Sequence, residues 1–298
     1  MESFLGPHKN DKSWNPYVVI RHGILSSDEP FRSLEYFMQS EFPKAIVDNQ
    51  SYTWTDNVVL NGAKLAKSLL SNPNAMSRPV VLIGHSMGGL VCRAANLFLR
   101  QPNLEVTDRI VLLNYYNQSQ ADLNALVALR LTSHKASPVS LVATLGTPNS
   151  GAMLKAQLSA MGDLLNKALA VKFKSLDDLN TARLFRLFQY FSTDTPVLSI
   201  SGSGWNRLSK AKTDPIFWAP HLAARLHLPN DMIVEDRSVD LRQSIFPNEA
   251  VSGQRSRYLH VRLYRDCTDV THTTMYDHAD LRNVLIDAMK RCNDSKAK

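Results

Sequence analysis

The sequence predicts an α/β fold in which a mostly parallel sheet of about six strands is flanked by helices. Short apolar runs, often rich in β-branched residues, alternate with amphipathic helical patterns along most of the 298 residues. This alternation is typical of βαβ units. The chain is long enough to bury a large core, and its 44% hydrophobic and 20% charged residues are ordinary for a globular protein. We therefore expect residues 1–298 to form a single domain.

The first half of the chain supplies three predicted strands, and a helix follows each of them. The strands are 17–21, 44–48 and 79–84. The helices are 30–42, 57–71 and a segment from about Met87 to Arg100. In the second of these helices apolar residues recur near helical spacing, at Val58, Val59, Leu65, Leu69 and Leu70.

The second half adds strands at 140–146, 196–201 and 258–264 and closes with an amphipathic helix at 278–291.

Three segments interrupt the alternation of strands and helices. Residues 103–138 form an insertion of unknown role, because a loop of about 2–6 residues would suffice there. Residues 151–193 carry helix-like patterns with more apolar surface than one helix face can bury. This surplus fits either core helices or a helical cap over a site. The stretch 203–257 contains four prolines and is rich in loops.

The formal net charge is +7, and a basic balance can indicate a nucleic acid or an anionic membrane as partner. The Lys and Arg residues are dispersed, with no run of five or six. We therefore interpret the charge as solvated surface and expect no nucleic acid partner. A weak peripheral attraction to an anionic membrane remains compatible with it.

The number of cysteines and the length of the apolar tracts indicate the cellular compartment of the protein. Cys92, Cys267 and Cys292 cannot pair completely and lack metal-ligand spacing, which argues against a disulfide scaffold. The N-terminal residues lack the basic and apolar regions of a secretory signal. No apolar tract approaches the roughly 20 residues of a membrane span. We expect a soluble, cytoplasmic protein, and export without a signal peptide stays open.

The turn Gly84-His85-Ser86-Met87-Gly88 joins a predicted strand to a predicted helix. A serine on such a tight turn projects its Oγ above the carboxyl edge of the sheet, where strained backbone angles are tolerated. A Cβ at position 84 or 88 would collide with neighbouring backbone, and the helix N-terminus stabilises negative charge near the serine. The pattern predicts Ser86 as a nucleophile. The plain alternative is a glycine-rich linking turn.

A serine nucleophile needs a base, an acid that orients the base, and donors for the oxyanion. In this arrangement the chain order is Ser, acid, His, so the base should follow the last strand. Only His272 and His278 lie there. His272 sits in a loop that can lean over the sheet edge, whereas His278 begins the final helix. We favour His272.

The acid should lie between the last two strands, where residues 230–240 offer Asp231, Glu235, Asp236 and Asp240. Asp231 precedes an apolar pair that can pack its loop against the core and hold the carboxylate still, so we favour it. Solvated surface charge is the commonest fate of the other acids. The oxyanion donors should be the backbone N–H of Met87, after the serine, and that of Ile24, after His22-Gly23.

At these positions the chain resembles the lipase and esterase branch of the α/β-hydrolases, especially bacterial triacylglycerol lipases and GPI inositol deacylase-like proteins. The resemblance spans about 17 to 290 and rests on HGIL at 22–25, GHSMGG at 84–89, TLGTPNSGA at 144–152, NDMIVEDRSV at 230–239 and HTTMYDHADLRNVL at 272–285. Asn149 replaces the histidine of the family's T-P-H-x-G turn, and Met232 replaces the glycine of its acid loop. The resemblance implies an α/β-hydrolase fold and selects the same Ser86, Asp231 and His272.

The sequence therefore predicts a serine hydrolase that cleaves carboxylic esters, of lipids or other acyl groups, through an acyl-enzyme on Ser86. The same triad would serve acyl transfer or the cleavage of thioesters and amides. A non-catalytic binding protein is the alternative from another functional class.

We expect a helical cap at 151–193, with Phe185 and Phe188 lining an acyl pocket. The alternative is that these side chains fill the core. We expect no cofactor and no metal, and the oligomeric state is not indicated.

Overall fold

The computed structural model of the chain describes residues 14–23, 26–100, 137–149, 195–202, 239, 258–262 and 274–296. Within them six strands form one sheet in the order β2-β1-β3-β4-β5-β6, and every neighbouring pair is parallel. The strands are β1 (Tyr17–Arg21), β2 (Ile46–Asn49), β3 (Val80–His85), β4 (Val139–Leu145), β5 (Val197–Ser201) and β6 (Tyr258–Arg262).

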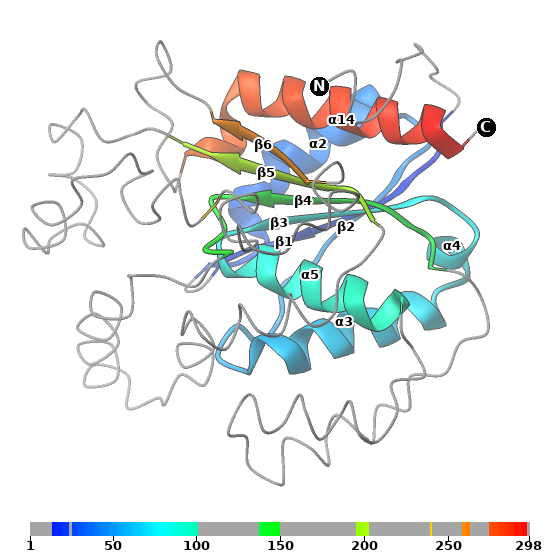
Figure 1. The fold of residues 1–298 in the computed structure, drawn as a ribbon, viewed down its shortest axis with the longest axis vertical. Helices are drawn as coiled ribbons and strands as arrows, with labels where there is room; N and C mark the ends of the chain where they lie inside the picture. Colours follow the sequence, from blue (N-terminus) through cyan, green and yellow to red (C-terminus); the bar gives the residue numbers. More distant parts are fainter. Residues whose placement is uncertain are drawn as a thin grey trace, which may run out of the picture.

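Helices cover both faces of the sheet (Figure 1). One face carries η1 (Glu29–Phe31), α2 (Arg32–Glu41), η5 (Met275–Asp277) and α14 (Ala279–Lys296). The other face carries α3 (Val58–Ser71) and α5 (Met87–Arg100), and the short α4 (Pro73–Met76) follows α3. The predicted α/β architecture, with a parallel sheet between helices, is confirmed.

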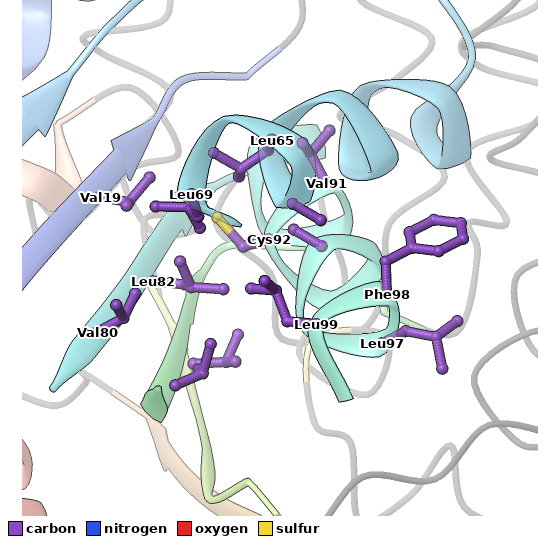
Figure 2. Packing of buried hydrophobic residues seen from close by; sticks show 14 of the residues in the cluster. Val19, Leu65, Leu69, Val80, Leu82, Val91, Cys92, Leu97, Phe98 and Leu99 are labelled. Carbon is purple, nitrogen blue, oxygen red and sulfur yellow. The ribbon is translucent and has the colours of Figure 1, made fainter. Parts of the chain in front are cut away.

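Side chains of each strand alternate between the two faces, so each face has its own core. The core beneath α3 and α5 includes Val19, Leu65, Leu69, Val80, Leu82, Val91, Cys92, Leu97, Phe98 and Leu99 (Figure 2). The core beneath α2 and α14 includes Val18, Ile20, Leu34, Met38, Ile83, Leu141, Leu285 and Met289. Because both faces are covered, the strands read as continuous apolar runs in the sequence.

Helix α3 shows how local residues set an element's start and end. The side chain of Asn57 accepts hydrogen bonds from the backbone N–H groups of Val59 (2.8 Å) and Leu60 (3.3 Å), as an N-cap does. At the other end Asn72 follows α3 and caps α4 by accepting from the N–H of Asn74 at 3.0 Å. Pro73 suits the first position of α4, where no intrahelical hydrogen bond is lost.

The predicted strands and helices lie where the sequence places them, with ends shifted by a few residues. The short α4 and η5 were not predicted. Of the insertion 103–138 only residues 137 and 138 are described, and the candidate cap 151–193 lies outside the described residues, so both stay predictions. None of the helices that the structure describes is long and apolar enough to cross a membrane.

The order of the strands locates the place where a ligand would bind. The chain passes from β1 to β2 on one side and then returns to β3 on the other side of β1. The winding direction therefore reverses between β1 and β3. In open parallel sheets ligands bind outside the carboxyl ends of the strands at such a switch point. The turns that follow β1 and β3 flank this point, and Ser86 lies in the second of them.

Candidate active site

Ser86 occupies a strained turn between β3 and α5. Its φ is 53°, and it is the only residue other than glycine with a positive φ among those that the structure describes. Such a conformation costs about 1–3 kcal/mol and persists only where the surroundings enforce it. The N–H of Ser86 donates to the carbonyl of Leu145 at 2.8 Å, and its carbonyl accepts from the N–H of Gly89 at 3.1 Å. The predicted elbow geometry is present.

The two glycines of the turn allow strand and helix to touch. A Cβ on Gly84 would lie 2.4 Å from the backbone of Gly88. A Cβ on Gly88 would lie 2.3 Å from the carbonyl oxygens of both Arg21 and His22. Any side chain at either position would push α5 away from β1 and β3. The sequence-based reason for these glycines therefore holds, and β1 contributes part of the close contact.

The turn after β1 borders the serine side chain. A Cβ on Gly23 would lie 2.7 Å from the Cβ of Ser86 and 3.2 Å from its Oγ. Met87, one of the two expected oxyanion donors, begins α5 and is buried. The first N–H groups of a helix have no acceptor within it, so this end of α5 can receive an anion. Ile24, the other expected donor, lies outside the described residues.

His22 is held in one orientation by the segment that follows β2. Its Nδ1 is 2.8 Å from the carbonyl oxygen of Gly23, and its Nε2 accepts from the N–H of Tyr52 at 3.4 Å. The Tyr52 hydroxyl donates to the carbonyl of His22 at 2.9 Å, and the two rings stack with centroids 4.6 Å apart. These partners require a neutral ring protonated on Nδ1. Burial lowers the pKa of His22 and thereby favours the neutral form.

His85, the residue before Ser86, packs against η1 and η5. Its ring centroid is 5.5 Å from that of Phe31 and 5.7 Å from that of Tyr276, and the Phe31 and Tyr276 rings are 4.4 Å apart. Met275 is fully buried beside them. The segment that leads into α14 therefore contacts the residue before the serine. Burial raises the pKa of the Tyr276 hydroxyl, which keeps it neutral.

His278, the alternative base, contacts the start of α14. Its Nδ1 accepts from the N–H of Asp280 at 3.3 Å and lies 3.8 Å from the Asp280 carboxylate. Its ring is thus engaged with the helix that it precedes. His272 lies outside the described residues, as do Asp231 and the competing acids Glu235, Asp236 and Asp240.

Asn149 connects three parts of the site. Its side-chain carbonyl accepts from Arg93 of α5 at 3.0 Å. Its amide donates to the carbonyl of Val239 at 2.9 Å and to the Thr144 hydroxyl at 3.3 Å. Val239 belongs to the segment that contains the candidate acids. A buried amide that both donates and accepts thus ties Val239 to the turn after β4 and to the helix that follows Ser86.

Sequence reasoning placed Ser86, Met87 and His22-Gly23 together, and the structure brings Ser86, Met87 and Gly23 together. The sequence reasoning missed Tyr52. The only indication of its role in the sequence is that it is an aromatic residue shortly after a predicted strand. The pocket residues Phe185 and Phe188 lie outside the described residues. Within the described ranges, no three His, Cys, Asp or Glu side chains gather as they would around a metal ion.

The sheet topology and the strained serine turn define the α/β-hydrolase fold, and the chain has this fold. Lipase BlEst2 from Bacillus licheniformis in its mature form is similar, with a TM-score of 0.58 and 17% identity over 95% of each chain. An inhibited form of esterase B from Lactobacillus rhamnosis is similar with a TM-score of 0.50 and 15% identity, over 96% of this chain and 77% of that one. At these identities the likeness shows the fold alone. No protein-family model matches the sequence, and no curated protein matches it.

Proposed function

We propose that this protein is a serine hydrolase that cleaves carboxylic esters, of lipids or other acylated molecules, through an acyl-enzyme on Ser86. The observation that carries the proposal is the strained Ser86, placed at the switch point of the sheet with Gly23 against its Oγ. The similar structures of a lipase and an esterase support the choice of reaction.

In the proposed reaction the Ser86 Oγ attacks the ester carbonyl while His272 takes the hydroxyl proton. The tetrahedral oxyanion receives hydrogen bonds from the N–H groups of Met87 and Ile24. His272 then returns the proton to the departing alkoxide, which leaves as an alcohol. Water, deprotonated by His272, attacks the acyl-enzyme and releases the carboxylic acid and free Ser86. Asp231 orients His272 and stabilises its imidazolium.

Contacts near the end of the chain support His272 as the base. Tyr276 packs against His85, next to Ser86, and His272 lies four residues before Tyr276. An extended chain spans at most about 3.6 Å per residue, so the Cα atoms of residues 272 and 276 are separated by no more than roughly 14 Å. His278 is engaged with Asp280 at the start of α14, which weakens the alternative.

The hydrogen bond from Asn149 to Val239 supports an acid from the segment 230–240. It holds Val239 beside the turn after β4, at the same edge of the sheet as Ser86. Asp231 remains our choice within the segment on the sequence argument.

The geometry of His22 supports Ile24 as an oxyanion donor. The His22 ring holds the carbonyl of Gly23. In a planar trans peptide the carbonyl and the following N–H point in opposite directions. We therefore expect the N–H of residue 24 to point away from the ring.

Acyl transfer and the cleavage of thioesters or amides would use the same residues, and nothing in the described geometry favours one of them over ester hydrolysis. The helical cap at 151–193, the acyl pocket with Phe185 and Phe188, weak contact with anionic membrane and a cytoplasmic location remain parts of the proposal that rest on the sequence.

Turnover of p-nitrophenyl esters from acetate to medium chains tests the proposal. We expect hydrolysis that becomes more efficient with chain length, because each buried methylene contributes about 0.8 kcal/mol. Ser86→Ala should abolish it. Ser140→Ala is the matched control, because Ser140 is also buried in the sheet but donates to the carbonyl of Val80 at the amino ends of the strands. Normal turnover by Ser86→Ala would refute the mechanism, and a preference for acetate would refute the acyl pocket.

A further inference from the structure

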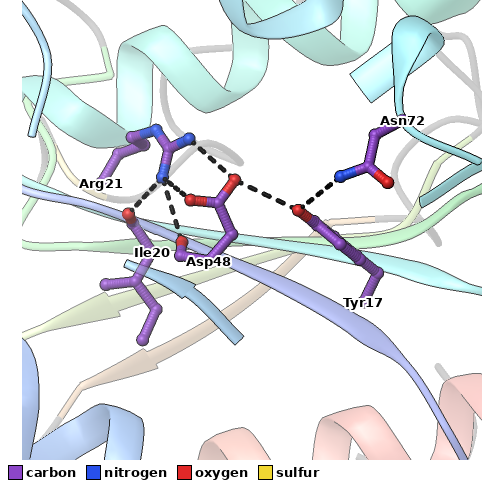
Figure 3. Close-up of polar contacts among 5 residues, drawn as sticks. All are labelled: Tyr17, Ile20, Arg21, Asp48 and Asn72. Carbon is purple, nitrogen blue, oxygen red and sulfur yellow. Dashed lines mark hydrogen bonds and ion pairs between the residues drawn. The ribbon is translucent and has the colours of Figure 1, made fainter. Parts of the chain in front are cut away.

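A buried ion pair joins the last residue of β1 to β2. Arg21 and Asp48 approach to 3.2 Å, and their side chains are 7% and 9% exposed. The guanidinium also donates to the carbonyls of Ile20 (2.8 Å) and Asp48 (3.0 Å) and to the second carboxylate oxygen of Asp48 (3.3 Å). Figure 3 shows that Tyr17 and Asn72 extend this network. The Tyr17 hydroxyl donates to Asp48 at 3.4 Å and accepts from Asn72 at 3.0 Å.

The ion pair lies where β1 stops pairing with β2 but still pairs with β3. The register of β1 with β2 ends at Ile20 and Asn49, whereas the register of β1 with β3 continues to Arg21 and Gly84. At Arg21 the side chain therefore takes over the link to β2 that the backbone no longer makes.

Two segments of the candidate site follow this pair in the chain. His22 and Gly23 follow Arg21 directly. A Cβ on Gly23 would lie 2.7 Å from the Cβ of Ser86, and a Cβ on Gly88 would lie 2.3 Å from the carbonyl oxygens of Arg21 and His22. Tyr52, which holds His22 through its hydroxyl and its N–H, lies four residues after Asp48. A shift of either partner would move the backbone that faces the serine.

Stability alone is a weak reason for such a pair. Taking two charges out of water is costly, and well-packed apolar residues often stabilise a fold as well or better. Removal of one partner, by contrast, leaves the other charge buried without compensation. The Arg21 guanidinium also acts electrostatically on the His22 ring. Its positive charge adds to the effect of burial in lowering the pKa of His22.

We propose that Arg21 and Asp48 are positioning residues for ester hydrolysis, fixing the backbone at His22-Gly23 against Ser86 so that the oxyanion donors stand in place before the substrate arrives. Neither side chain touches the substrate. The inference rests on the proposed hydrolase function and deepens it.

The test compares Arg21→Met, Asp48→Leu and the double variant by thermal unfolding and by the kcat and KM of ester hydrolysis. Each single variant should unfold at a lower temperature, because it leaves a buried charge. The double variant should recover most of the Tm, while its kcat stays roughly 10- to 100-fold low with little change in KM, since displaced oxyanion donors weaken the transition state alone. Recovery of both Tm and kcat would overturn the inference.

Two further sets of variants keep the test decisive. If the double variant does not fold, two conservative variants keep the charges. Arg21→Lys loses the forked guanidinium donors, and Asp48→Glu displaces the carboxylate by one methylene. They should lower kcat at nearly wild-type Tm, and unchanged kcat would overturn the inference. Thr195→Val is the control, because its hydroxyl donates to Asn96 in a buried pair at 3.0 Å just before β5. It should lower Tm and leave kcat unchanged.

The wild type and Ser86→Ala separate the two claims. If Ser86→Ala is inactive and the pair variants retain full kcat, the positioning role fails and the hydrolase function stands. If the wild type turns over no ester, both fail.

Discussion

Two histidine–tyrosine pairs flank Ser86, one on each side of the sheet, and they hold the turn in different ways. On the side of α3 and α5, the rings of His22 and Tyr52 stack at an interplanar angle of 27°, and Tyr52 donates two hydrogen bonds to His22. Its backbone N–H donates to Nε2 of the ring, and its hydroxyl donates to the backbone carbonyl. On the side of α2 and α14, the rings of His85 and Tyr276 meet edge to face at 80°, with Phe31 beside them.

The two pairs differ in the kind of contact that they make, and therefore in how strictly they set the orientation of the backbone. Hydrogen bonds are directional, so the first pair fixes the orientation of the peptides at His22 and Gly23. Contact between rings is less directional and stabilises by burial and by edge-to-face attraction. The second pair therefore packs η5 against His85, the residue before Ser86, without fixing a particular peptide. The site combines a hydrogen-bonded backbone on one side with aromatic packing on the other.

The largest expected effect concerns His272, the base that we propose, which lies four residues before Tyr276 in the chain. His272→Ala should lower kcat by about a millionfold, on the order of removing a triad member. His278→Ala should keep activity and lose only a contact with the start of α14. Steady-state kinetics of both variants decides the matter. An inactive His278→Ala beside an active His272→Ala would reverse the assignment.

A smaller effect on kcat should distinguish Tyr52 from Tyr276. Tyr52→Phe keeps the stacked ring but leaves the carbonyl of His22 without its donor, and we expect kcat to fall about 5- to 10-fold, the worth of one hydrogen bond. Tyr276→Phe keeps the ring contacts with His85 and Phe31 and should retain kcat. Each change removes one oxygen, so the two variants are controls for each other. Equal losses would show that the pairs do not differ as described.

The smallest effect is a dependence of stability on pH. Burial lowers the pKa of His22 in the folded state, and the Arg21 charge adds to this effect, while the hydrogen bond to the Gly23 carbonyl and the Asp28 charge oppose it. The unfolded chain therefore binds the proton first, at about pH 6.5. Stability from neutral His22 is full above that pH and is lost as the pH falls below it. The Tm of the wild type should thus fall more steeply between pH 7.5 and 5.5 than that of His22→Asn. Parallel curves would contradict the neutral, buried assignment.

The sequence predicted the strands well because runs such as 17–21 and 79–84 are buried on both faces and therefore apolar throughout. It predicted α3 because apolar residues repeat at helical spacing over four turns. It missed α4 because four residues are too few for a periodic signal. Ser86 and the glycines were predicted because the elbow is a local pattern. Tyr52, Asp48 and the bonds of Asn149 were missed because their partners lie 30, 27 and 90 residues away in the chain. The opposite charges that end the predicted strands 17–21 and 44–48 were the available signals for the ion pair.

Labelling with a fluorophosphonate probe tests the central claim, that Ser86 is an activated nucleophile, most directly. The purified protein should gain one adduct, mapped by mass spectrometry to the peptide that contains Ser86, with loss of ester hydrolysis in proportion to labelling. Ser86→Ala should remain unlabelled, and Ser140→Ala should be labelled at the wild-type rate. An unlabelled wild type that still hydrolyses esters, or an adduct on another residue, would contradict the account.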